Sequence, residues 1–301
     1  MKLLVTGSIG IDTVEAPSGK AVDALGGSSI YFSYAASFFG PVRLVGVVGD
    51  DCPDGFLKPL EDNPNIDLAG LEVREGSQTF RWHGRYHDDI NVRDTIEVDL
   101  NVLEEVGPQI PEPFLDSEYV FLANTHPGLQ MELLGQLSGP KLVVADTMDL
   151  WIRTEREALD ALLERIDGFV LNDGEAKLLT EKYNLIEAGL EIARMVRRFV
   201  IVKKGEHGSI LFMEGKAYPL PGYPAGTVLD PTGAGDCYAG AMMGHLAATG
   251  ATDALALREA IAYGTVTASI ELEDFSLNRL IGTTREDIDK RLAEYRELAR
   301  F

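Results

Sequence analysis

Leu142-Val143-Val144-Ala145 and Gly168-Phe169-Val170-Leu171 are short apolar runs, and a helix-like stretch from Glu155 to Arg165 lies between them. Uninterrupted apolar strands that alternate with helices are typical of a parallel sheet covered by helices on both faces. The alternation extends in both directions along the chain and predicts an α/β fold with a mainly parallel central sheet. Further strands are predicted at residues 3–5, 42–48, 119–122 and 199–202.

The helices of this fold are predicted from apolar stretches that stop at glycine or proline. Ser28 to Phe39 follows Gly26-Gly27 and ends at Gly40-Pro41, so Ser28 or Ser29 is expected to cap a helix there. Other helices are expected at residues 187–197, 236–249, 254–269 and 285–298.

Residues 70–100 have a different pattern. Leu71 to Arg74, Thr79 to Trp82 and Thr95 to Val98 alternate apolar with polar side chains. A period of two is typical of half-exposed antiparallel strands. We therefore predict a small β-layer that lies against the main domain.

Composition limits the partners of the chain. Its 301 residues include 48 acidic and 27 basic ones, which gives a formal net charge of −21. So acidic a surface repels phosphate backbones and anionic membranes, and it predicts no nucleic-acid and no membrane partner. The two cysteines, Cys52 and Cys237, suggest reduced thiols, and no apolar run approaches the roughly 20 residues of a membrane span. We expect a cytoplasmic enzyme.

The segment with the clearest chemistry is Thr232-Gly233-Ala234-Gly235-Asp236, which precedes a small, apolar, helix-like stretch that reaches Leu246. At a helix N-terminus the free backbone N–H groups and the positive end of the macrodipole attract phosphate, and glycines let it approach closely. A phosphate would repel the Asp236 carboxylate. We therefore interpret Asp236 as a general base for an attacking hydroxyl, with an ordinary acidic helix cap as the alternative.

The whole segment Asp230-Pro231-Thr232-Gly233-Ala234-Gly235-Asp236 resembles the C-terminal signature of the ribokinase-like, or PfkB, carbohydrate kinases. The resemblance implies a ribokinase-like three-layer α/β/α sandwich, with residues 1–301 as a single catalytic domain and a β-lid at about 11–25 and 70–100. It also implies ATP-dependent phosphorylation of a hydroxyl on a sugar or sugar-like molecule. Asp236 would be the catalytic base, and the amides of Gly233, Ala234 and Gly235 the anion hole.

Three further segments are similar to motifs of the same family, in the same order. Gly26-Gly27 is similar to its N-terminal di-glycine signature. Asn172-Asp173-Gly174-Glu175 is similar to an Asn-x-x-Glu motif that organises magnesium and phosphate. Asn172 and Glu175 would act on Mg²⁺ mostly through water, and the alternative is that Asn172 only caps a helix. Lys203, Gly205 and Gly208 are similar to a nucleotide-binding loop, to which Asp230 and Thr232 add further cofactor contacts.

The resemblance also implies where the substrate binds. Gly26 and Gly27 would contact it, together with Asp12, Asp146 and Tyr31. Asp12 stands where an acidic residue holds sugar hydroxyls, and a carboxylate accepts well from a vicinal diol. Asp146 follows a strand whose end often carries an Asp near the phosphates. Tyr31 stands where the family usually has a substrate-binding Asn, and Lys203 where several members have Thr. The family often binds K⁺ beside the Asp230 loop, and we assign that ion to no residue.

Aromatic and arginine side chains crowd the predicted lid. Trp82 and its neighbours could stack on a sugar face or a nucleobase, and an arginine could receive a substrate phosphate. Alternatively, these side chains pack against the lid of a second subunit in a homodimer. His83 and His87 are interpreted as loop residues and not as metal ligands. The crowded residues are Phe80, Arg81, Trp82, Arg85, Tyr86 and Arg93.

Two other functions remain open. The chain has no Gly-x-x-x-x-Gly-Lys-Ser/Thr segment and no protein-kinase motifs, which excludes those kinase classes. A nucleoside kinase of the same fold is the first alternative, favoured by Tyr31, Phe32 and Trp82. A non-catalytic protein that senses sugars or nucleotides is the second, although it would have no need of Asp236.

Overall fold

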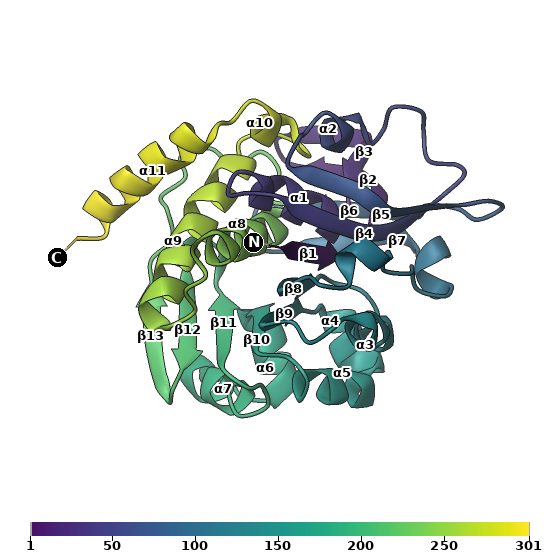
Figure 1. Cartoon of the computed structure of the whole chain (residues 1–301). Coiled ribbons are helices and arrows are strands. Elements are labelled where there is room, and N and C mark those ends of the chain that lie inside the picture. Colours follow the sequence, from purple (N-terminus) through teal and green to yellow (C-terminus); the bar gives the residue numbers. More distant parts are fainter. Residues whose placement is uncertain (1, 301) are drawn as a thin grey trace.

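The computed structural model describes residues 2–300, and its centre is a nine-stranded sheet with the strand order β13-β12-β11-β10-β9-β8-β1-β4-β5 (Figure 1). Strands β11, β12 and β13 pair antiparallel, and every other neighbouring pair is parallel. The mainly parallel sheet is therefore confirmed. Its strands are β1 (Leu3–Thr6), β4 (Val42–Gly49), β5 (Ile66–Arg74), β8 (Tyr119–Leu122), β9 (Leu142–Asp146), β10 (Gly168–Asn172), β11 (Phe199–Lys203), β12 (Ser209–Met213) and β13 (Lys216–Leu220).

Helices cover both faces of this sheet because its strands are apolar on both sides. Leu3 and Val5 of β1 pack into one core with helices α1, α8, α9 and α11, whereas Leu4 packs into a second core with α3, α5, α6 and α7. The two cores make the three-layer arrangement. The helices are α1 (Ser28–Ser37), α2 (Lys58–Glu61), α3 (Pro127–Gln136), α4 (Asp149–Thr154), α5 (Arg156–Leu163), α6 (Asp173–Thr180), α7 (Leu185–Ile192), α8 (Ala234–Thr249), α9 (Ala254–Glu271), α10 (Asn278–Ile281) and α11 (Arg285–Leu298), with short 3-10 turns at 101–104, 112–114 and 205–207.

The prediction that Ser28 or Ser29 caps α1 is wrong. The helix begins after Gly27, whose φ of 104° only glycine adopts easily, and no side chain caps it. Ser28 and Ser29 are engaged elsewhere, because the Ser28 amide donates to Ser8 Oγ at 3.0 Å and Ser29 Oγ donates to the Ser8 carbonyl at 2.8 Å. The two serines therefore fasten α1 to the end of β1.

A separate four-stranded sheet has the order β3-β2-β6-β7 and consists of β2 (Gly10–Ala16), β3 (Gly19–Gly26), β6 (Phe80–Tyr86) and β7 (Arg93–Asp99). We call it the small sheet. The prediction that the β-layer includes residues 71–74 is wrong, because these belong to β5, which pairs parallel with β4. As the edge strand of the large sheet, β5 has partly exposed side chains and therefore alternates like an antiparallel strand.

The small sheet touches the large domain at several points. Thr232 Oγ1 bonds to the hydroxyl of Tyr86 at 3.2 Å, and Asn91 Nδ2 donates to Glu206 at 3.0 Å. Ser18, in the turn after β2, donates to the carbonyl of Leu229. The sheet thus lies closed against the loops before α8 and after β11.

Two findings concern the chain as a whole. Cys52 and Cys237 are free thiols. Within residues 2–300, no helix combines the length and apolar character needed to cross a membrane.

Candidate active site

Three predicted site residues lie in a row where parallel strands end. Asp146, Asn172 and Lys203 are the last residues of β9, β10 and β11, which are neighbours in the sheet, and Asn172 pairs directly with Lys203. The N-terminus of α8 meets this edge, since a Cβ built on Gly235 would lie 2.6 Å from the Nζ of Lys203. The fold therefore places the ammonium group of Lys203 directly against the predicted anion hole.

The loop before α8 is shaped by Asp230. Its Oδ1 accepts from the Thr232 amide at 2.8 Å, and its Oδ2 accepts from the Ser276 amide at 3.3 Å. Gly233, at φ 87°, turns the chain into the helix. A Cβ on Gly233 would lie only 2.4 Å from the ring of Tyr31. Gly233 is therefore required both for its backbone angle and for this close approach.

Asp236 is in the first turn of α8, and its carboxyl group titrates close to neutrality. Burial raises the pKa of Asp236 to about 7; Lys203 opposes this rise, Glu175 adds to it, and Arg93 opposes it. Burial and the charge of Asp236 also hold the pKa of Asp146 well above its ordinary value. A carboxyl group with a pKa near 7 is well matched to accept a proton at neutral pH.

Asn172 and Glu175 form a capping box at the start of α6. Asn172 Oδ1 accepts from the Glu175 amide at 2.8 Å, and Glu175 Oε2 accepts from the Asn172 amide at 2.7 Å. The alternative that Asn172 caps a helix is thus confirmed, and it leaves Glu175 Oε1 outside the capping box. A role of this pair in metal binding stays a prediction.

The side-chain oxygens available at this edge fit a hydrated magnesium ion. Asp146 is 5% exposed, and its Oδ1 has no hydrogen-bond partner, so a hard oxygen is available there beside Glu175. Within residues 2–300, no three His, Cys, Asp or Glu side chains are arranged to hold a metal by themselves. Mg²⁺ usually takes one or two carboxylates and fills its shell with water and phosphate oxygens.

Asp12 lies on β2 of the small sheet and faces the loop before α8. A Cβ on Gly26 would lie 1.9 Å from Asp12 Oδ2, so Gly26 makes the space for this carboxyl group, whereas a Cβ on Gly27 would lie 2.5 Å from the Ser8 carbonyl oxygen. Asp12 is buried, and its Oδ1 has no partner. Burial, followed by the charges of Asp230 and Asp236, raises its pKa to about 8.

Tyr31 and Trp82 occupy different places. Tyr31 is 2% exposed and packs against Gly233, so its ring supports the backbone of the predicted anion hole. Trp82 lies on β6, where its Nε1 donates to Thr95 Oγ1 at 3.3 Å and its ring faces the guanidinium of Arg93 at 5.3 Å. Of the two, only Trp82 lies on a partly exposed surface.

The predicted nucleotide loop follows β11. Gly205 and Gly208 have φ angles of 54° and 81°, and a Cβ on Gly205 would lie 2.7 Å from Asn91 Oδ1. A Cβ on Gly208 would lie 2.1 Å from the carbonyl oxygen of Leu220. Both glycines therefore permit close packing, on one side against the tip of the small sheet.

Comparison with known proteins agrees with this geometry. Residues 130–281 match the family described as pfkB family carbohydrate kinase. The chain belongs to the pfkB family of carbohydrate kinases. It is 28% identical over 250 residues to a cytidine kinase from Thermococcus kodakarensis, which covers 81% of this chain and 87% of that protein.

Solved structures of pfkB-like proteins share the fold. A nucleoside kinase from Burkholderia thailandensis in complex with inosine superposes with a TM-score of 0.80 at 19% identity, over 97% of this chain and 98% of that one. A ribokinase II from E. coli in complex with ATP and Mg²⁺ gives a TM-score of 0.78 at 19% identity, over 97% and 99%. The ribokinase-like fold is thereby confirmed, and the family match together with the cytidine kinase confirms the kinase class of this pfkB chain.

The structure also brings residues to the pfkB site that the sequence did not assign to it. Arg93 and Tyr86 of the small sheet lie beside the loop before α8, and Glu271 of α9 lies close enough to raise the pKa of Tyr31. The crowding of arginines on the small sheet was visible in the sequence. Which of them faces the site depends on the strand register, which the sequence does not specify.

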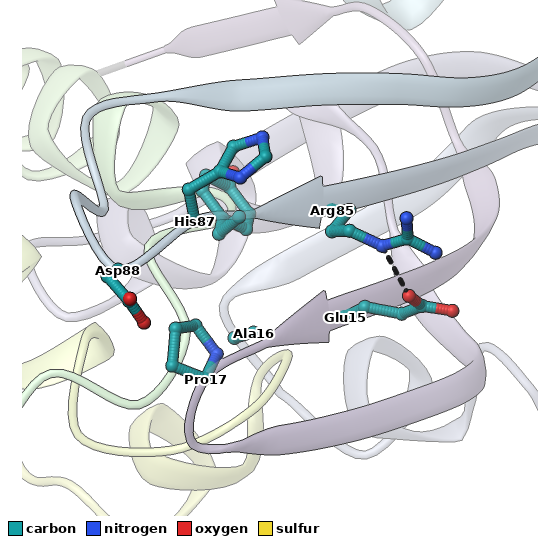
Figure 2. A pocket seen from close by; sticks show the side chains of 7 residues that line it. Glu15, Ala16, Pro17, Arg85, His87 and Asp88 are labelled. Carbon is teal, nitrogen blue, oxygen red and sulfur yellow. Dashed lines mark hydrogen bonds and ion pairs between the residues drawn. The ribbon is translucent and has the colours of Figure 1, made fainter.

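A hollow outside this site lies beside the small sheet. It measures about 320 Å³ and lies between the turn after β2 and the loop after β6 (Figure 2). None of the predicted site residues lines it. Figure 2 shows the ion pair between Arg85 and Glu15 at its edge, with an N···O distance of 2.7 Å. His83, which was expected in a loop, lies instead on β6 and pairs with Glu15, and His87, just after β6, pairs with Asp94.

Proposed function

We propose that this pfkB-family chain transfers the γ-phosphoryl group of ATP to the 5′ hydroxyl of a nucleoside. The observation that carries the proposal is the meeting of Asp236 and Lys203 at the N-terminus of α8, where a base, a cation and the first backbone amides of the helix converge. The 28% sequence identity to the cytidine kinase, and the structural likeness to a nucleoside kinase in complex with inosine, support a nucleoside as the acceptor.

Asp12 is proposed to hold the ribose of the acceptor. Its buried Oδ1 has no partner in the protein, and a carboxyl group is a good ligand for the vicinal 2′ and 3′ hydroxyls. In a nucleoside the base occupies C1′, so the 5′ hydroxyl is then the only one free to react. That hydroxyl would lie toward Asp236, whose charge reaches Asp12.

In the transfer step Asp236 would accept the proton of the 5′ hydroxyl. The nucleoside oxygen forms a bond to the γ-phosphorus, and the bond from that phosphorus to the β–γ bridging oxygen breaks, so ADP leaves with the electron pair. Lys203 and the amides of Gly233, Ala234 and Gly235 would stabilise the charge on the phosphoryl oxygens. No reorganisation of the site is needed, because Lys203 already lies against Gly235.

Magnesium and the nucleotide complete the proposal. Asp146, Asn172 and Glu175 would hold Mg²⁺ through water, and the ion would supply charge neutralisation on the phosphates. Gly205 and Gly208 would hold the nucleotide, next to Lys203, Asp230 and Thr232.

A panel of acceptors tests the proposal. Cytidine, inosine, adenosine, uridine and guanosine are compared with ribose and fructose, with ATP and Mg²⁺, and products are identified by mass spectrometry. We expect a nucleoside 5′-monophosphate, with a kcat/KM at least about tenfold above that of either free sugar, and no product from the matching 5′-deoxynucleoside. A free sugar as the preferred acceptor would contradict the nucleoside assignment and leave the transfer chemistry intact.

We further propose a monovalent cation, K⁺, beside Glu271. This side chain is fully buried, neither of its oxygens has a hydrogen-bond partner, and burial followed by Asp230 and Asp236 raises its pKa well above the ordinary value. A cation would offset these charges. KCl should raise the Tm above that in choline chloride for the wild type and have no such effect on Glu271→Gln; equal Tm values of the wild type in both salts would contradict this.

A homodimer through the small sheet also stays a prediction. Val22 on β3 and Ile96 and Val98 on β7 are large apolar side chains exposed on this sheet, and a second copy of the chain would pack on them. Light scattering of the full chain should then give twice the mass of one chain.

A further inference from the structure

We propose that Arg93 contacts the transferred γ-phosphoryl group and stabilises its charge from the side opposite Lys203. Arg93 is then a second catalytic cation, carried by the small sheet. The inference rests on the proposed phosphoryl transfer, but not on the identity of the acceptor.

Strand pairing places Arg93 on the inner face of the small sheet. Residues directly opposite in an antiparallel pair share a face, and Arg93 is opposite Tyr86. The hydroxyl of Tyr86 contacts Thr232 Oγ1 at 3.2 Å, which belongs to the loop that leads into the anion hole. Arg93 is therefore one strand away from a residue that touches the phosphate loop.

Arg93 also differs from the other arginines of the small sheet. Arg81 pairs with Asp51 at 3.3 Å, and Arg85 pairs with Glu15 at 2.7 Å. Arg93 is exposed, and within residues 2–300 it has no ion pair; its guanidinium lies over the ring of Trp82 at 5.3 Å. An aromatic face holds a guanidinium flat and leaves its N–H groups free to bind an anion.

The charge of Arg93 acts on the phosphate side of the site. Burial raises the pKa of both Asp236 and Glu175, and the charge of Arg93 opposes that rise at each. The pKa of Asp12, at the proposed ribose side, is set by burial, Asp230, Asp236 and the Gly27 amide. Arg93 therefore lies close enough to Asp236 and Glu175 to act on them, on the face of the small sheet that it shares with Tyr86.

A planar guanidinium can bond to two phosphoryl oxygens at once, and an ammonium cannot. Because Arg93 is on the small sheet, its contact would exist only when that sheet is closed. Closure would then complete the site at the moment when water is excluded.

The test compares Arg93→Ala, Arg93→Lys and the control Arg85→Ala, which removes an arginine from the outer face of the same sheet. We measure kcat, KM for the acceptor, the Kd for ATP, and the Kd for ADP with aluminium fluoride, a mimic of the transferred phosphoryl group. Arg93→Ala should lower kcat about 10²- to 10³-fold and weaken the mimic by a similar factor, with the Kd for ATP within about threefold. Arg93→Lys should recover part of the loss, and Arg85→Ala should stay within about twofold.

Two results would overturn the inference. If Arg93→Ala keeps its kcat and its affinity for the mimic, Arg93 does not touch the phosphoryl group. If only KM for the acceptor rises, Arg93 binds the acceptor instead. Every variant is measured with the acceptor that the wild type uses. A wrong acceptor assignment therefore appears only in the wild-type panel. A wrong role of Arg93 appears only in the ratios of kcat and of mimic affinity between variant and wild type.

Discussion

The C-terminal edge of the large sheet and the inner face of the small sheet both supply the site, but they do so under different constraints. At the large sheet, Asp146 is buried with an unpaired oxygen, and the ammonium of Lys203 lies against Gly235. On the small sheet, Arg93 is exposed, and contacts such as Tyr86 with Thr232 hold the sheet in place. The fixed groups are preorganised by the core, whereas the groups on the small sheet act only while it is closed.

This difference also has an energetic side. Asp146 and Glu271, both outside the small sheet, are buried carboxyl groups with unpaired oxygens, and each costs stability when it ionises. Rigid surroundings are needed to hold such groups in place. Function and stability therefore oppose each other at the fixed part of the site.

A large effect on kcat is expected from a change at the fixed edge. Gly235→Ala introduces a Cβ 2.6 Å from Lys203 Nζ, so the ammonium must leave the anion hole. We expect kcat to fall about 10²-fold, with Tm within a few degrees of the wild type, because only the end of a flexible side chain has to move. Gly226→Ala is the control, since a Cβ there meets nothing within 4 Å. A Gly235→Ala enzyme with unchanged kcat would show that the position of Lys203 is not important.

A smaller effect, on stability, is expected from Asp12→Asn. The pKa of Asp12 is about 8 in the folded protein and near 3.8 in the unfolded chain. Between about pH 4 and pH 8 the Asp12 carboxyl group is therefore protonated in the folded protein and ionised in the unfolded chain. The free energy of unfolding falls as the pH rises through that window. Asparagine cannot ionise.

The Tm of Asp12→Asn relative to the wild type should therefore rise by a few degrees from pH 5 to pH 8, measured by differential scanning calorimetry. Asp88→Asn, a change at an exposed carboxylate, should show no such trend. A difference between Asp12→Asn and the wild type that is constant with pH would contradict the shifted pKa of Asp12.

The smallest effect is expected from Tyr86→Phe, which tests the closed position of the small sheet. The change removes one hydrogen bond to Thr232, worth about 1 kcal/mol. We expect KM for the acceptor to rise up to about fivefold, with kcat nearly unchanged, in steady-state assays. A large fall in kcat would mean that Tyr86 takes part in the chemistry and does not only hold the sheet closed.

The sequence predicted the fixed region better than the small sheet. Apolar runs such as Leu142 to Ala145 identify buried parallel strands, and the Asp230–Asp236 segment locates the start of α8. Residues 71–74 were assigned wrongly because an edge strand with one exposed side alternates like an antiparallel one. Arg93 could not be singled out, because its opposition to Tyr86 depends on a register that includes a bulge between His83 and Gly84. Asn172 fits a helix cap and a metal-site residue equally well from the sequence.

The central claim is that Asp236 accepts the proton of the attacking hydroxyl at a preformed phosphate site. Asp236→Asn keeps the size of the side chain and removes the base. The most direct measurement follows the phosphorylated acceptor in a single turnover of this variant, alongside the Kd for ATP by calorimetry. We predict a transfer rate about 10³-fold or more below the wild type with the Kd for ATP unchanged. A transfer rate within tenfold of the wild type would contradict the claim.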